Sequence, residues 1–94
     1  MYSLSEQASC DLDSILDYSM DNFGAEVMLG YHHSLERCFT LLAEHPDLGT
    51  AAEHVRDDYF CFYHRSHAVF YTLIDNDILI VRVLHKSMDV PRHF

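Results

Sequence analysis

Three apolar segments decide the fold of this chain, and they lie in residues 59–84, which read YFCFYHRSHAVFYTLIDNDILIVRVL. Residues 59–63, 68–74 and 78–84 are rich in aromatic and β-branched side chains, so each segment predicts a β-strand. Residues 75–77 (Asp-Asn-Asp) can adopt the positive backbone angles of a tight turn, which predicts antiparallel pairing of the last two strands. Their nearly continuous apolar character indicates that both are central strands.

Two amphipathic helices are predicted ahead of these strands. Residues 2–4 are a short extended segment, and Ser5 can cap a helix that ends at Gly24, where a left-handed conformation is available. A second helix should follow at once and end at Glu44, before the turn residues 45–49. Apolar spacings of three and four give one stripe on each helix. The stripes are Ala8, Leu12, Ile15, Leu16, Ser19 and Phe23, and then Met28, Tyr31, Leu35, Cys38, Phe39 and Leu42.

This order of elements predicts one α+β domain over residues 1–94. It has an N-terminal strand, then an antiparallel helical hairpin that packs on one face of a twisted, mainly antiparallel sheet, in the order β-α-α-β-β-β. A hairpin of this size needs the sheet as a packing partner, because conformational entropy offsets most of what its own apolar contacts contribute. The other face of the sheet is expected to remain available for function.

Charge is distributed unevenly along the chain. The formal net charge is -9, from 15 acidic residues against 6 Lys and Arg. Residues 1–58 hold 12 of the acids and only Arg37 and Arg56 as bases, whereas residues 59–94 hold three acids and four bases. Such a charge opposes direct binding to nucleic acid and favours a protein partner. Any anionic partner should meet the C-terminal part.

Several classes of protein are excluded by what the sequence lacks. No uninterrupted apolar run approaches the roughly 18–20 residues that cross a bilayer, and no basic segment precedes an apolar one at the N-terminus. Cys10, Cys38 and Cys61 are odd in number and widely spaced, which favours reduced thiols and a cytoplasmic location. Three glycines form no phosphate loop and no nucleophile elbow, so no cofactor is expected.

The candidate functional residues are cations and histidines in or beside the strands. They are Arg56, Arg65, His67, Arg82, His85, Lys86 and Arg92. Arg82 lies inside an apolar run, so a structural alternative is that it pairs with an acid such as Asp57 or Asp58 while its stem packs on the sheet. No metal site is expected, because His64 and His67 should point to opposite faces of a strand. The adjacent His32 and His33 are expected to be surface or packing residues.

Several stretches, taken in order, resemble the ParE family of type II toxin–antitoxin toxins, which belongs to the RelE/ParE superfamily. The stretches are YSLS at 2–5 with Ala8, Asp11-Leu12, Ile15, Tyr18 and Phe23-Gly24; LLAEHPDLG at 41–49; Arg56 and Tyr59; AVFY at 68–71; and ILIVRVLH at 78–85, followed by Ser87-Met88-Asp89 and Pro91.

The resemblance implies a toxin that a cognate, ParD-like antitoxin silences by direct binding in a hetero-oligomer. Its target would be DNA gyrase, held in the complex with cleaved DNA, without chemistry by the toxin. The expected target-binding residues are Arg56, Arg65, Arg82, His85, Lys86, Met88 and Arg92, and the expected antitoxin-binding residues are Phe60, Phe62 and Tyr71.

Two alternatives remain open. A RelE-like, ribosome-dependent mRNA endoribonuclease would use Arg65, Arg82 and His85 to stabilise phosphate charge and to move protons. A homologue that binds its antitoxin without being toxic is the other alternative.

Overall fold

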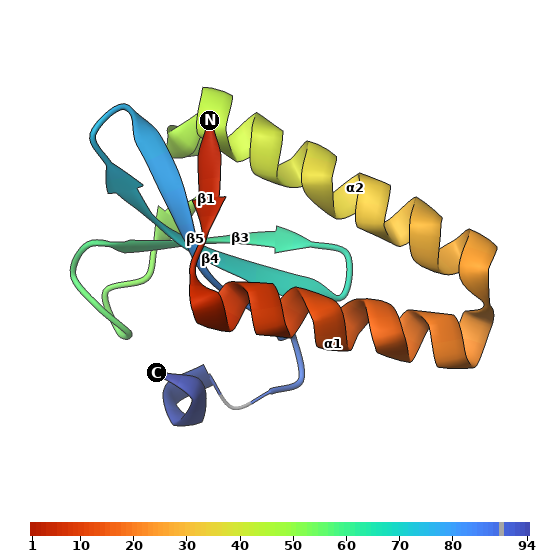
Figure 1. The fold of residues 1–94 in the computed structure, drawn as a ribbon. Coiled ribbons are helices and arrows are strands. Elements are labelled where there is room, and N and C mark those ends of the chain that lie inside the picture. The colour runs from red at the N-terminus through yellow and green to blue at the C-terminus, as the bar shows by residue number, and fades with distance from the viewer. Residues whose placement is uncertain (89) are drawn as a thin grey trace.

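The computed structural model describes residues 1–88 and 90–94, without the side chain of Pro91. Asp89, part of the stretch that resembles the toxin family, lies outside the described residues. The elements follow the predicted order (Figure 1). They are β1 (Tyr2–Leu4), α1 (Glu6–Phe23), α2 (Ala25–Glu44), the 3-10 helix η1 (Pro46–Leu48), β2 (Thr50–Ala51), β3 (Tyr59–His64), β4 (His67–Ile74), β5 (Asp77–His85) and the 3-10 helix η2 (Val90–His93).

The described strands form one mixed sheet in the order β1-β5-β4-β3-β2. The strands β5 and β4 are central, as predicted, and β3 to β5 pair antiparallel. The first strand, β1, lies parallel to β5 with Tyr2 opposite Ile78, a pairing that sequence reasoning did not resolve. The two-residue β2 was also not predicted, and it pairs only with Phe60 and Cys61 of β3. The α+β class is confirmed.

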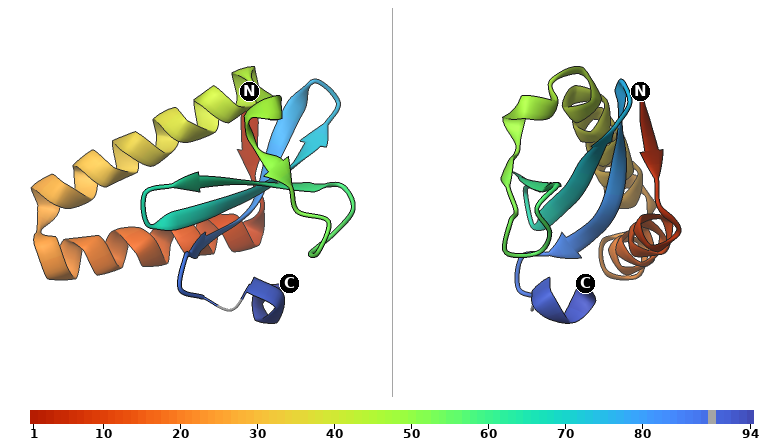
Figure 2. Two further views of the ribbon diagram at one scale, coloured as in Figure 1. Left: turned by 180° about the vertical axis from the view of Figure 1, so that it is seen from behind. Right: turned by 90° about the vertical axis from the view of Figure 1, so that its left-hand side faces the viewer.

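Local sequence signals place the helix ends where they were predicted. The Ser5 side chain accepts a hydrogen bond from the Ala8 amide and so caps α1. Gly24 joins the helices with a φ of 90°, which a residue with a Cβ rarely adopts. The hairpin covers one face of the sheet (Figures 1 and 2). The main core between the two layers consists of Ala8, Leu12, Leu35, Cys38, Phe39, Leu42, Val69, Tyr71, Ile78, Ile80 and Val83.

Burial decreases toward the Gly24 end of the hairpin. Leu35 and Phe39 are fully buried, but Phe23 is 62% exposed and Val27 is 51% exposed. The joined ends of α1 and α2 extend past the strands in Figure 1, which agrees with the exposure of the residues on either side of Gly24. The prediction that Phe23 belongs to the buried stripe was therefore wrong, because helical periodicity does not indicate where the opposing layer ends.

The second face of the sheet is covered rather than free. A smaller core of Ala52, Cys61, Ala68, Phe70 and Leu84 lies on this face, with Val55, Tyr59 and Val90 packed against it. The loop between β2 and β3 and the C-terminal residues supply this cover (Figure 2). The expectation that the whole face remains available for function was wrong, since a chain this small uses both faces of its sheet for burial.

A β-bulge on β5 decides which side chains face the helices. Phe70 pairs with Arg82 and Tyr71 pairs with Ile80, so Val81 has no partner on β4. Side chains alternate along a regular strand, which would place Arg82 on the same face as Ile78 and Ile80. The extra residue shifts the alternation, so that Val83 joins the main core and Arg82 leaves it.

Candidate functional site

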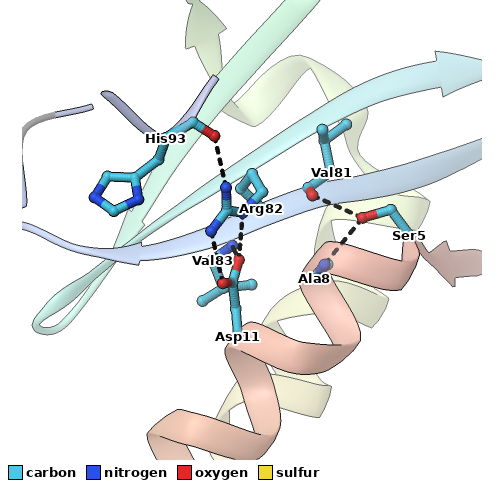
Figure 3. A network of polar contacts seen from close by, with 7 residues as sticks. All are labelled: Ser5, Ala8, Asp11, Val81, Arg82, Val83 and His93. Atoms are coloured by element: carbon cyan, nitrogen blue, oxygen red, sulfur yellow. Dashed lines mark hydrogen bonds and ion pairs between the residues drawn. The ribbon is translucent and has the colours of Figure 1, made fainter. Parts of the chain in front are cut away.

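Arg82 and Asp11 form a partly buried ion pair between β5 and α1 (Figure 3). Arg82 Nε and Nη2 donate to the two carboxylate oxygens of Asp11 at 2.7 and 2.8 Å. The Val83 amide donates to Oδ2 of Asp11 at 3.0 Å, and Arg82 Nη1 donates to the His93 carbonyl at 2.6 Å. The hydrogen bonds that Arg82 donates to the Asp11 carboxylate raise the pKa of Arg82 above its usual value.

This geometry corrects two expectations about Arg82. It pairs with an acid, as the structural alternative predicted, but the acid is Asp11 rather than Asp57 or Asp58. All three guanidinium nitrogens donate within the chain, so Arg82 is not available as a target contact in this conformation. Sequence reasoning missed Asp11, although a signal existed. Asp11 lies three residues after Ala8 and four before Ile15, so it falls within the apolar stripe of the first helix. A carboxylate in that position needs a hydrogen-bond donor or a cation as its partner.

A cluster of histidines lies where the β3–β4 turn meets α2. The Tyr31 hydroxyl and His67 Nδ1 lie 2.6 Å apart, and the Ser34 hydroxyl and His64 Nε2 lie 2.7 Å apart. His64 and His67 are directly opposite each other across the hairpin, and the Tyr31 ring contacts both rings. The expectation that these histidines point to opposite faces was wrong, because Arg65 and Ser66 form a two-residue turn between two strands.

Burial is the main cause of the titration behaviour of this cluster. It lowers the pKa of His67 to about 4, with further contributions from the nearby His85 and His64. Burial also lowers the pKa of His64, and the neighbouring Arg65 adds to this effect. Both imidazoles are therefore neutral at pH 7, which suits their hydroxyl partners.

Three of the predicted target-binding residues lie at this end of the sheet. Arg65 occupies the tip of the β3–β4 turn with a φ of 52°, and its side chain is exposed. The His85 ring packs edge-on against His67 at 5.4 Å, and its Nδ1 lies 2.7 Å from the Ser87 hydroxyl. The Lys86 ammonium lies over the Tyr63 ring, 5.6 Å from its centroid. We call the surface formed by Arg65 and Lys86, with the neighbouring His85, the cationic end of the sheet, after its Arg and Lys side chains.

The other predicted target-binding residues lie elsewhere. Arg56 lies over the Tyr59 ring at 5.6 Å, beside the cover of the second face. Met88 is 44% exposed, and Arg92 is an exposed residue of η2. The structure therefore does not bring the seven residues together into one surface.

The predicted antitoxin-binding residues differ in access. Tyr71 is fully buried, and its hydroxyl donates to the Pro46 carbonyl and accepts from the Gly49 amide, so no partner can reach it in this conformation. Phe60 stacks on Tyr71 with ring centroids 5.6 Å apart. Phe62 is only partly buried and contributes to an open groove of about 1070 Å³ between α2 and β3.

This groove lies beside an unpaired strand edge. Within the part of the chain that the structure describes, β2 pairs with Phe60 and Cys61 alone, and no strand lies beside Phe62 to His64 on that side of β3. The groove is lined by Tyr2, Gly30, His33, Ser34, Glu36, Arg37, Cys38, Thr40, Leu41, Glu44, Phe62, Tyr63, His64 and Arg65. It offers both backbone hydrogen-bonding groups and apolar side chains.

The three residues named for a ribonuclease are not assembled as one catalytic group. His85 of β5 pairs with His67 of β4, next to the β3–β4 turn that contains Arg65. The Arg82 guanidinium instead contacts Asp11 and the His93 carbonyl. Within residues 1–88 and 90–94, no three His, Cys, Asp or Glu side chains gather closely enough to hold a metal ion. Neither helix in that part of the chain is long and apolar enough to cross a membrane.

The fold places the chain in a class of small α+β proteins with a helical hairpin on a mixed five-stranded sheet. A chain of the chromosomal ParDE TA system from P. aeruginosa shares this fold with a TM-score of 0.76 at 17% identity, over 89% of this chain and 92% of that one. The conserved hypothetical protein HP0894 from Helicobacter pylori gives a TM-score of 0.56 at 15% identity, over 92% and 93% of the two chains.

Sequence comparison identifies the family. Residues 2–90 match the family described as the ParE toxin of the type II toxin-antitoxin system parDE. Toxin ParE1 of Caulobacter vibrioides is 38% identical over 92 residues, which cover 98% of this chain and 95% of that protein. Toxin ParE1 of Mycobacterium tuberculosis is 33% identical over 93 residues, with the same coverage. The chain therefore belongs to the family of ParE toxins of type II toxin–antitoxin systems.

Proposed function

We propose that this ParE-family toxin inhibits DNA gyrase by stabilising the gyrase complex with cleaved DNA, and that a cognate antitoxin prevents this by direct binding. Inhibition of this kind needs tighter binding to the cleaved state than to the resealed state, and it needs no chemistry by the toxin. The proposed target places the toxin in the cytoplasm.

The observation that supports this function best is the separation of charge along the molecule. Residues 1–36 contain seven acids and neither Lys nor Arg, so α1 and the first half of α2 are strongly acidic. Arg65 and Lys86 lie at the cationic end of the sheet. A protein with net charge -9 can meet a complex of protein and DNA only in an orientation that turns its cations toward the phosphates.

We place the antitoxin in the groove between α2 and β3. An extended antitoxin segment can pair with the free edge of β3, and an apolar side chain of that segment can pack on Phe62. Antitoxin segments that fold on binding commonly wrap their partner in this way. The groove also includes His64 and Arg65, so an antitoxin bound there would sit beside the cationic end and compete with the target.

A gyrase assay with the purified chain tests the target. We expect accumulation of cleaved DNA and loss of supercoiling, both suppressed by the antitoxin. Lys86→Ala should weaken inhibition by roughly tenfold, the usual effect of one charge pair in an interface. Arg37→Ala removes the same charge from α2 and serves as the control in the assay without antitoxin, because Arg37 lines the groove assigned to the antitoxin.

The same purified toxin also distinguishes gyrase inhibition from the two alternatives, a ribonuclease and a non-toxic homologue. If micromolar toxin leaves gyrase active but causes cleavage of mRNA on translating ribosomes, the ribonuclease alternative replaces this proposal. If neither target responds and cells that express the chain without antitoxin grow normally, the chain is a non-toxic homologue that retains antitoxin binding.

The antitoxin site has its own matched pair of variants. Phe62→Ala should weaken antitoxin binding by roughly tenfold or more, because truncation of an apolar anchor typically costs over 1 kcal/mol. Leu73→Ala removes an exposed apolar side chain from β4, outside the groove, and should leave the affinity unchanged. Equal affinities of these two variants would place the antitoxin on another surface.

A further inference from the structure

The C-terminal segment, residues 90–94, is attached to the sheet at two points. The His93 carbonyl accepts a hydrogen bond from Arg82 Nη1. The Phe94 ring packs edge-on against Phe70 with centroids 5.1 Å apart, and it also contacts Tyr59 at 5.8 Å. These contacts hold the segment against the sheet. Even so, Phe94 remains 43% exposed.

Asp11 fixes the orientation of the first attachment. A guanidinium group donates in a rigid planar fork, so two hydrogen bonds to one carboxylate determine the direction of the third nitrogen. The Asp11 carboxylate is itself held by the Val83 amide (Figure 3). The side chains of Arg82 and Asp11 are only 13% and 14% exposed, which limits exchange of these bonds with water. With Arg82 held in this way, Nη1 points at the His93 carbonyl.

We propose that Asp11 and Arg82 are positioning residues that hold the C-terminal segment in the conformation that contacts the toxin's target. This proposal rests on the proposed function, because it concerns how the toxin presents residues of the segment such as Arg92 and Phe94. If the segment is already ordered in the free toxin, less conformational entropy is lost when the target binds, and binding is tighter. The antitoxin groove between α2 and β3 contains neither Asp11 nor Arg82, so antitoxin binding should not depend on the pair.

The first test measures access to the chain terminus, independently of any target. In a chain expressed to end at Phe94, carboxypeptidase removes that residue only when the segment is released, and mass spectrometry follows its loss. Asp11→Asn and Arg82→Gln should release Phe94 roughly tenfold to a hundredfold faster, the range expected for a charge-assisted hydrogen bond. Asp13→Asn makes the same change on an exposed position of α1 and should match the wild type.

The second test compares two activities of each variant. Asp11→Asn and Phe94→Ala should each weaken gyrase inhibition by roughly tenfold, because the segment is no longer held in the conformation that contacts the target. The antitoxin affinity of both variants should stay within about threefold of the wild-type value. Arg82→Lys keeps the charge but not the fork, so it should not restore protection of Phe94.

Two results would overturn the proposal. One is the same rate of Phe94 release in Asp11→Asn as in the wild type. The other is a parallel fall of gyrase inhibition, antitoxin affinity and melting temperature, which would mean that the ion pair only stabilises the fold. A wild-type chain that fails to inhibit gyrase would refute the proposed function instead, and the carboxypeptidase comparison would still decide whether the pair holds the segment.

Discussion

The hydroxyl of Tyr31 and Nδ1 of His67 lie 2.6 Å apart and join the first half of α2 to the first residue of β4. A second contact of the same kind, between Ser34 and His64, lies one helical turn further along α2. Together they fix the β3–β4 turn, and with it Arg65, against the helix. The cationic end of the sheet is thus held by neutral imidazoles that accept or donate one hydrogen bond each.

These contacts predict a loss of stability in acid. The pKa of His67 falls from 6.5 to about 4 on folding, so between these values the unfolded chain binds a proton that the folded chain does not. The contribution of His67 is therefore fully present above about pH 6.5 and is lost as the pH falls toward 4. We expect a loss of about 1–2 kcal/mol, discounted for the solvent exposure of this half-buried ring.

Urea unfolding at several pH values, with an NMR titration of the imidazole resonances, measures this effect. His67→Gln should reduce the dependence on pH between 4 and 6.5, and His33→Gln, an exposed change on α2, should not. A His67 resonance that titrates near 6.5 would contradict the prediction.

Tyr71→Phe should destabilise the chain although it removes a single oxygen. The Tyr71 hydroxyl donates to the Pro46 carbonyl at 2.6 Å and accepts from the Gly49 amide at 2.9 Å, and both contacts close the turn after α2. We expect a decrease in the free energy of unfolding of about 1–3 kcal/mol, because two backbone groups lose their partner. Denaturant unfolding measures it, with Tyr63→Phe at a 63% exposed position as control.

Two glycines should respond in opposite directions to replacement by alanine. A Cβ at Gly49 would overlap the Tyr71 hydroxyl, so Gly49→Ala should disrupt the same turn. A Cβ at Gly30, in the interior of α2, would meet nothing within 4 Å. Gly30→Ala should therefore stabilise the chain by about 1 kcal/mol through helix propensity alone. Thermal unfolding of the two variants checks both signs, and equal shifts would refute the argument.

The three thiols should react at very different rates. Cys10 is exposed, whereas Cys38 and Cys61 are buried. Burial raises the pKa of Cys38 to about 11 and raises that of Cys61, so neither forms a thiolate at neutral pH. A thiol reagent at pH 7 should modify the folded chain once, at Cys10, and modify all three thiols only after denaturation. Rapid labelling of Cys38 in the folded chain would show that the main core opens readily.

Part of the candidate site could be predicted because it depends on local sequence. Arg65, His85 and Lys86 lie at strand ends, so the order of the strands places them at one end of the sheet. The position of Arg82 could not be predicted in the same way. Its pairing with Asp11 spans 71 residues, and the β-bulge at Val81 that turns it out of the core has no local signal.

The sequence by itself determined the two helices, the first strand and the three long strands, each close to its observed limits. The Ser5 cap, the positive φ of Gly24 and the turn at Asp75 are properties of a few neighbouring residues, and each holds in the structure. Only the tertiary structure decided the parallel pairing of β1, the cover of the second face, the exposure of Phe23 and the partners of the histidines. These depend on which distant surfaces meet when the chain closes, and the energy of such contacts is not encoded in any single segment.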